Sequence, residues 1–128
     1  EHYSRVLKVD LVGNRVWAQG RVKPSSESLT HAVIYRLDTN IRFVFHVHSP
    51  DIWRNREVLF LPETTVDIPY GTIEMASAVR QLSDAGAFRE RRILAMAGHE
   101  DGIISFAETA QIAGQALLDT LVLARQLS

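Results

Sequence analysis

The amino-acid sequence predicts an α/β fold in which helices pack on a β-sheet. Short β-branched and aromatic runs bounded by turn residues alternate with segments whose apolar side chains recur at helical spacing. The chain has 128 residues, enough for one domain with a sizeable core. Hairpin signals mixed with helices favour one sheet covered by helices, and we expect residues 1–128 to form this single domain.

Turn and capping residues define the first elements. Residues 6–11 alternate as a strand, Gly13-Asn14 is a two-residue hairpin signal, and residues 15–18 are the return strand. Residues 24–27 begin a helix that we expect to run to about Leu37, because Ser25 or Ser26 can cap it and Glu27 suits its first turn. Four side chains of this helix are available for burial: Leu29, Ala32, Val33 and Tyr35.

The middle of the chain contains two predicted strands separated by a polar segment. Residues 43–48 read as a strand, with Phe43, Phe45 and Val47 on one buried face. Residues 51–56 are polar apart from one tryptophan, which predicts a short irregular turn. Residues 57–61 are predicted as a short apolar strand that ends at a proline.

The last elements are two helices and two strands. Thr72 caps a helix that ends near Gly86. Residues 93–97 and 102–106 are strands on either side of a tight turn. A final helix of about twenty residues carries one apolar stripe, made by Ala110, Ala113, Leu117, Leu121 and Ala124.

Composition excludes several functional classes. Fourteen basic and fifteen acidic residues give a net charge of −1, so no nucleic-acid partner is expected. The absence of cysteine excludes disulfides, a thiol nucleophile and cysteine-ligated zinc, and it fits a cytoplasmic protein. No apolar run approaches about 18 residues, so no membrane association is expected. The chain begins at Glu1 rather than at methionine, and we expect it to be a portion of a longer protein.

Three histidines have the spacing that a metal site requires. His46 and His48 are two residues apart on one strand, so their side chains share a face about 6–7 Å apart at the backbone. His99 lies in the tight turn at the end of another apolar strand, where a ligand can project. Neutral imidazole is a common zinc ligand, and three protein ligands with one open position are typical of catalytic zinc. The competing interpretation is that these histidines bond only to backbone carbonyls.

Two carboxylates and a fourth histidine are candidates for roles beside the metal. Glu27 sits at a helix start, where a base can be held, although a first-turn capping acid is the simpler interpretation. His31 lies one helical turn later and could orient Glu27 or the ligands. Glu100 follows His99 and is either a partner of the ligands or a solvated turn acid. Other His-x-His families fit poorly: a cupin is an all-β barrel, and a metallo-β-lactamase-type site needs an aspartate where Pro50 stands.

The order of these motifs resembles the class II aldolase/adducin family. The resemblance rests on Lys23-Pro24-Ser25-Ser26-Glu27, His46-Val47-His48-Ser49-Pro50, Ile68-Pro69-Tyr70-Gly71-Thr72, the His99 turn and the long last helix. It covers nearly the whole chain. It implies a single three-layer α/β domain whose mixed, largely antiparallel sheet is flanked by helices.

The resemblance also implies a set of residue roles. His46, His48 and His99 would bind Zn²⁺, or another divalent transition metal in its place. Glu27 would move a proton at the substrate carbon, and Ser25 and Ser26 would help to bind a substrate phosphate. Family members act on sugar phosphates and related hydroxy-carbonyl compounds as aldolases, epimerases or dehydratases, and they are usually homotetramers. A metal ion that chelates a ketose stabilises the enediolate formed when a C–C bond breaks or a proton leaves.

This chain departs from the family pattern in three places. By comparison with the family, we expect residues 1–128 to lack the N-terminal segment whose loops grip phosphate. The stretch from His48 to Pro69 is short, and it leaves Trp53 and Tyr70 as the aromatic candidates for a proton donor. Glu100 replaces the usual glycine after the third ligand, and Ala107 stands where glycine is common. Two alternatives therefore stay open: a non-catalytic adducin-like binding or assembly module, and a plain α/β domain with incidental histidines.

Overall fold

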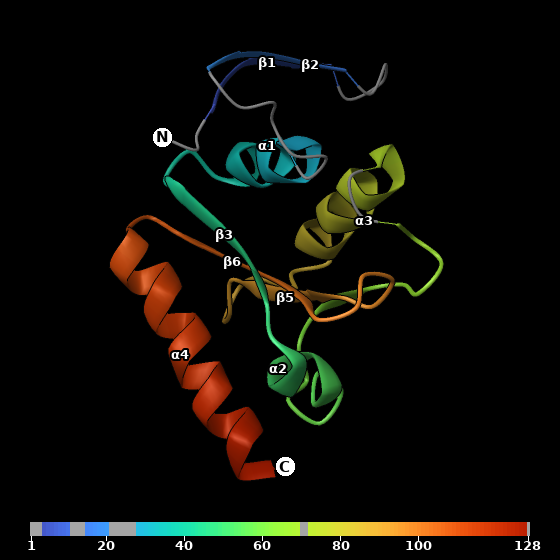
Figure 1. Cartoon of the computed structure of the whole chain (residues 1–128), viewed down its shortest axis with the longest axis vertical. Coiled ribbons are helices and arrows are strands. Elements are labelled where there is room, and N and C mark those ends of the chain that lie inside the picture. The colour runs from blue at the N-terminus through green and yellow to red at the C-terminus, as the bar shows by residue number, and fades with distance from the viewer. Residues whose placement is uncertain (1–3, 11–14, 21–27, 70–71, 128) are drawn as a thin grey trace.

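The structure is a computed structural model that describes residues 4–10, 15–20, 28–69 and 72–127 (Figure 1). The elements, in chain order, are β1 (Ser4–Asp10), β2 (Arg15–Gly20), α1 (Ser28–Leu37), β3 (Phe43–His48), α2 (Pro50–Arg54), β4 (Glu63–Thr64), α3 (Ile73–Asp84), β5 (Ile93–Met96), β6 (Gly102–Ala107) and α4 (Ala110–Leu127). The predicted α/β class is confirmed.

Two sheets make up the β-structure of the described residues. β1 and β2 form an antiparallel two-stranded sheet, as the hairpin signal predicted. The second sheet has the order β3-β6-β5-β4, in which the first two pairings are antiparallel and the last is parallel. The predicted mixed, largely antiparallel sheet is therefore confirmed. Figure 1 shows β3, β6 and β5 crossing the middle of the molecule, with helices on both sides.

Strand alternation divides the core between the two faces of the four-stranded sheet. Leu94 and Met96 of β5 pack on one face with residues of α1 and α3, whereas Ile93 and Ala95 pack on the other face with residues of α2 and α4. All of these β5 side chains are at most 1% exposed. A strand buried on both faces is flanked by two apolar layers, which explains the three-layer arrangement.

The helix boundaries of α3 and α4 agree with the sequence analysis. The Thr72 hydroxyl accepts a hydrogen bond from the Met75 N–H at 3.2 Å and caps α3, as predicted. α3 ends at Asp84, close to Gly86, whose φ of +83° is left-handed. α4 has 18 residues and buries Ala113, Thr120 and Ala124. No helix in the described segments is long and apolar enough to cross a membrane.

The prediction of an irregular turn over residues 51–56 is wrong, because a short helix, α2, begins there at Pro50. The Ser49 hydroxyl accepts from the Ile52 N–H at 3.4 Å, and Pro50 occupies the first helical turn. Ser followed by Pro is a helix-start signal that the polarity of the segment concealed. Ile52 is 2% exposed and fastens this helix to the core.

The predicted strand at residues 57–61 is also wrong, because this segment is a turn and β4 follows it at Glu63–Thr64. Phe60 has a φ of +56° and is 84% exposed, so it cannot continue a strand. The Arg91 guanidinium donates hydrogen bonds to the carbonyl oxygens of Leu59 and Phe60 at 2.6 and 2.8 Å. These two carbonyls therefore bond to Arg91, about thirty positions away in sequence, rather than to the backbone of a neighbouring strand.

Burial differs from the prediction at two aromatic residues. Tyr35 is 42% exposed, and the residues of α1 that are buried most deeply are Thr30, Val33 and Ile34. The side chain of Leu29 lies outside the described part. Phe43 is 40% exposed because it lies at the first residue of its strand, although Val47 packs in the core below α2 and α4 as expected.

Candidate metal centre

Strand β3 places His46 and His48 on one face of the sheet. β3 pairs with β6, and His46 lies opposite Ile104 while His48 lies opposite Gly102. Ile104 belongs to the core on the α1/α3 side, so the two histidines lie on that side. His46 is half-buried, and His48, at the end of the strand, is exposed.

His99 comes from the tight turn between β5 and β6. Its N–H donates to the Met96 carbonyl at 3.0 Å, and its own carbonyl accepts from the Gly102 N–H at 2.9 Å. Asp101 closes the turn with a φ of +65°, a left-handed conformation that aspartate tolerates better than most residues. Both hydrogen bonds hold the backbone of His99 between the two strand ends.

Two glycines make this turn sterically tight. A Cβ atom on Gly98 would lie 2.5 Å from the Ile68 carbonyl oxygen and 2.6 Å from that of Val66. A Cβ atom on Gly102 would collide with Cδ2 of the His99 ring. Glycine is required at both positions, because the backbone of residues 66–68 fills the side-chain space at Gly98 and the His99 imidazole fills it at Gly102. The sequence analysis identified the turn but not these packing roles.

The three imidazoles converge. Ring centroids are 5.2 Å apart for His46 and His48, 5.4 Å for His46 and His99, and 5.1 Å for His48 and His99. One ligand nitrogen from each ring lies within 4.8 Å of the other two. Nε2 of His46 and Nε2 of His99 are buried. Residues from β3 and from the β5–β6 turn thus form a single group that could hold a metal ion.

The donor set fits a divalent transition metal. Two nitrogens bound about 2.1 Å from one tetrahedral ion are roughly 3.4 Å apart, so the rings need to close by about an ångström or less each. All three donors are imidazoles, which suit zinc and its neighbours in the first transition series. A set of three protein ligands also leaves a coordination position for a substrate or water.

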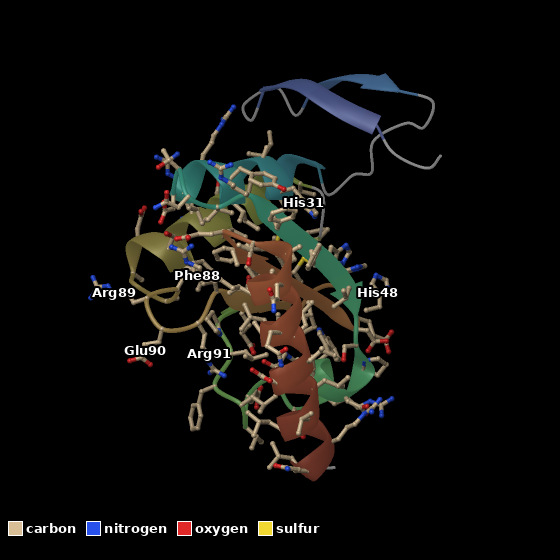
Figure 2. All side chains as sticks on the ribbon, turned by 90° about the vertical axis from the view of Figure 1, so that its left-hand side faces the viewer. His31, His48, Phe88, Arg89, Glu90 and Arg91 are labelled. Carbon is tan, nitrogen blue, oxygen red and sulfur yellow. The ribbon has the colours of Figure 1, made fainter. Side chains whose placement is uncertain are left out.

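The other predicted site residues are placed differently. His31 is half-buried on α1 and is not one of the three converging residues. Figure 2 shows His31 on α1 and His48 on β3. Glu100 is exposed in the His99 turn. Their roles beside a metal stay predictions.

Glu27, Ser25, Ser26 and Tyr70 lie outside the described residues. The roles assigned to the first three, proton transfer and phosphate binding, also stay predictions. α1 begins at Ser28, immediately after Glu27.

The loop that contains Asp67 borders the turn, and the pKa of its carboxylate is lowered. Asp67 lies between Val66 and Ile68, whose carbonyls press against Gly98. Hydrogen bonds from the Thr65 side chain and from its own backbone N–H hold the pKa of Asp67 below its usual range. The Asp67 carboxylate is exposed and stays ionised down to low pH.

The described residues also border a cavity that lies away from the three histidines. Its volume is about 490 Å³, and its lining includes Arg92, Ile93, Phe106, Ile112 and Leu123, with none of the three clustered histidines. It is located where β5 begins and β6 ends, whereas His99 follows the end of β5. Figure 2 shows Glu90 and Arg91, which also line this cavity, on the side of the molecule away from His48. We place the candidate chemistry at the histidines, because their donor atoms converge.

Comparison with known families agrees with this geometry. A family model described as the class II aldolase and adducin N-terminal domain matches residues 2–126. A search of curated proteins finds no match. The matched range contains the mixed sheet, its flanking helices and all three clustered histidines, so this chain belongs to the class II aldolase/adducin family.

Proposed function

We propose that this protein is a metal-dependent enzyme of the lyase type that acts on a small hydroxy-carbonyl compound or a sugar phosphate. The convergence of His46, His48 and His99 carries the proposal, because three imidazoles within 4.8 Å of one another form an incomplete coordination shell. Zinc is the metal we propose, and the reaction is of the aldolase, epimerase or dehydratase type.

The protein's own groups would divide the work as follows. His46, His48 and His99 would hold the ion, which when bound supplies a Lewis acid that polarises a carbonyl. The edge position of His48 leaves one side of the group open to solvent, where a small substrate can approach. Nε2 of His46 and the side chain of Met96 are buried, and a side of the site that is shielded from water would strengthen electrostatic interactions there.

Glu27 is the residue that we propose moves the proton at the carbon next to the carbonyl. A carboxylate held partly out of water has a raised pKa and can act as base and then as acid. The position of Glu27, directly before α1, supports the proposal, because α1 packs on the same face of the sheet as the histidines. Ser25 and Ser26 would bind a substrate phosphate beside it.

We also propose that the protein is a cytoplasmic homo-oligomer, a tetramer by analogy with the family. Exposed apolar side chains on α4 support self-association, since their contact with another copy would remove them from water. These are Ile112, Leu118, Val122, Leu123 and Leu127, each at least 49% exposed.

Replacement of His48 by alanine tests the metal. The variant should lose near-stoichiometric zinc in elemental analysis, because two imidazoles form a much weaker site than three. Glu90→Ala is the control and should keep its zinc, since Glu90 is exposed beside the cavity that the histidines do not line. Unchanged zinc content in His48→Ala would overturn the assignment.

Replacement of Glu27 by glutamine tests the chemistry. The variant should keep zinc and lose turnover, because the amide has the shape of the carboxylate but cannot take a proton. A panel of ketose phosphates and hydroxy acids, assayed with and without zinc, supplies the substrate. A zinc-loaded protein that is inactive on the whole panel would instead favour a non-catalytic, adducin-like binding or assembly module.

A further inference from the structure

The segment after His48 reaches across to the turn that carries His99. The backbone N–H of Ser49 donates to the Asp101 carbonyl at 2.8 Å. Four residues later, the indole Nε1–H of Trp53 donates to the Met96 carbonyl at 3.0 Å. Met96 and Asp101 lie on either side of residues 97–100, so the turn is held at both of its ends.

The Met96 carbonyl is shared between the indole and the ligand-bearing residue. It accepts the N–H of His99 at 3.0 Å and the Nε1–H of Trp53, also at 3.0 Å. Met96 is 0% exposed, so water cannot easily replace a lost donor. Loss of the indole N–H would therefore weaken the orientation of the same carbonyl that positions His99.

Trp53 is itself held in a defined position. The Arg56 guanidinium lies 4.1 Å from the centre of the indole ring, and its Nη1 donates to the Trp53 carbonyl at 2.9 Å. Nε of Arg56 lies 3.4 Å from a Glu63 carboxylate oxygen. The indole also packs against the core on the α2/α4 side of the sheet. Because the Trp53 indole is fixed in this way, its N–H can in turn fix the position of the Met96 carbonyl.

From this geometry we infer that Trp53 is a positioning residue of the histidine centre. Together with the Ser49 N–H it forms a clamp that ties the end of β3, which carries His48, to the turn that carries His99. The inference rests on the proposed function, because a shared ion is what makes the separation of these two rings matter. Because the indole N–H of Trp53 is donated to the Met96 carbonyl, its role would be to set where the third ligand stands rather than to act as the proton donor considered from the sequence.

The clamp gives the isolated chain a way to preorganise its metal ligands. His46 and His48 lie in the β3 strand, which pairs with β6, whereas His99 lies in a turn outside the strand ladder. Outer hydrogen bonds that orient metal ligands typically change metal affinity by about 10- to 100-fold. Trp53 acts through a backbone carbonyl rather than on an imidazole, so we expect an effect near the lower limit of that range.

Substitution of Trp53 by phenylalanine tests the inference, because it keeps an aromatic ring and removes the N–H donor. Zinc affinity, measured by competition with a chromogenic chelator, should fall roughly tenfold. The visible absorption bands of the Co²⁺-substituted protein should also shift, because they report the ligand geometry around the ion. Ile52→Val is the matched control: it loosens the same helix at a residue 2% exposed but leaves the indole bond intact. Its Co²⁺ bands should match those of the unaltered protein.

A second measurement needs no variant and does not depend on whether Trp53→Phe folds. Zinc should order the His99 turn and slow the hydrogen exchange of the Trp53 indole N–H, observed by NMR. The protein's second tryptophan, Trp17, supplies the internal reference signal and should show no comparable change.

The outcomes separate the two proposals. If the unaltered protein binds zinc, and if Trp53→Phe keeps both its affinity and its Co²⁺ bands, the positioning role is wrong and the proposed metal centre stands. Equal indole exchange with and without zinc would also contradict the positioning role. If Ile52→Val shifts the bands as much as Trp53→Phe, the clamp is no more than general support from α2. If the unaltered protein binds no zinc, both proposals fail together.

Discussion

The two ends of the β5–β6 hairpin are built in opposite ways. At the end that holds residues 97–102, there is no room for a Cβ atom on Gly98 or Gly102, and three imidazoles meet. At the other end, Arg92 and Phe106 border a cavity of about 490 Å³. Glu90 and Glu108 are exposed there. One hairpin therefore combines a rigid end with a loosely packed end.

This difference shows where the fold demands exact geometry. A metal centre needs its ligands within fractions of an ångström of their bound positions, and close packing with backbone hydrogen bonds supplies that accuracy. The loosely packed end must only keep the strands together. Substitutions at the rigid end should therefore affect both stability and metal binding, whereas substitutions at the loose end should affect stability alone.

The largest effect is expected for Gly98→Ala. The new Cβ would lie 2.5 and 2.6 Å from two backbone carbonyl oxygens, which cannot rotate away as a side chain can. Overpacking of this kind should lower the free energy of unfolding by about 3 kcal/mol, measured by urea denaturation.

The same substitution at Gly114 is the control for Gly98→Ala. A Cβ atom there would meet its nearest neighbour, in the Phe45 ring, at 4.0 Å, an ordinary contact. Gly114 lies inside α4, where alanine is favoured, so Gly114→Ala should stabilise the protein by about 1 kcal/mol. Similar losses of stability in the two variants would show that the turn is not especially tight.

Gly102→Ala should separate metal binding from stability at the rigid end. The new methyl group would collide with the His99 ring and lie 2.9 Å from Cε of Met96, two side chains that can move, and 3.0 Å from the His99 carbonyl oxygen. We expect a loss of about 1–2 kcal/mol in unfolding free energy. The displaced His99 ring should also weaken zinc binding roughly tenfold or more, measured by chelator competition. Full zinc affinity would contradict the proposed position of His99.

Leu123→Ala tests the loosely packed end. Leu123 is 49% exposed and borders the cavity, so its removal should cost roughly 1 kcal/mol of unfolding free energy. Zinc affinity should equal that of the unaltered protein, because the histidines line no part of this cavity. A zinc affinity that fell with Leu123→Ala would show that the two ends are coupled, against the comparison drawn above.

Asp38→Asn should have the smallest effect, and that effect should depend on pH. A backbone hydrogen bond from Asn40 and a side-chain hydrogen bond from Arg92, at 2.8 Å, hold the pKa of Asp38 below its ordinary value of 3.8. A carboxylate whose pKa is lowered by folding stabilises the folded state fully above 3.8, and this contribution disappears as the pH falls through the folded-state pKa. Urea titrations at neutral pH and in acid should therefore show the two proteins converging in acid. A difference that grew in acid would reverse the assigned direction.

Much of the fold could be predicted from local signals. Thr72 predicted the start of α3, Gly13-Asn14 predicted the first hairpin, and the apolar stripe predicted α4, because each depends on residues close together in the chain. Residues 57–61 were predicted wrongly for the opposite reason, because the carbonyls of Leu59 and Phe60 accept hydrogen bonds from Arg91, which is far away in sequence. The start of α2 had a local signal, Ser49 followed by Pro50, but the polarity of the segment concealed it.

Part of the candidate site could likewise be predicted from local signals, and part could not. The two-residue spacing of His46 and His48 on a strand requires a shared face, whatever the rest of the chain does. His99 is about fifty positions away, so its grouping with them was a hypothesis from its place in a turn at a strand end and from the family resemblance; the structure shows the three rings together. The indole bond of Trp53 had no sequence signal, because it depends on the turn at residues 97–101 lying next to α2.

The sequence by itself determined the class of fold, the capped start of α3, the extent of α4 and the identity of the histidines that can bind a metal. Periodicity, capping and turn preferences act over a few residues, so they can be read without knowledge of the fold. The tertiary structure alone decided that β6 lies between β3 and β5, which brings His48 and His99 together across the end of the sheet. It also decided which glycines had to remain glycines. Both depend on contacts between distant segments, and their geometry exists only after the layers have packed.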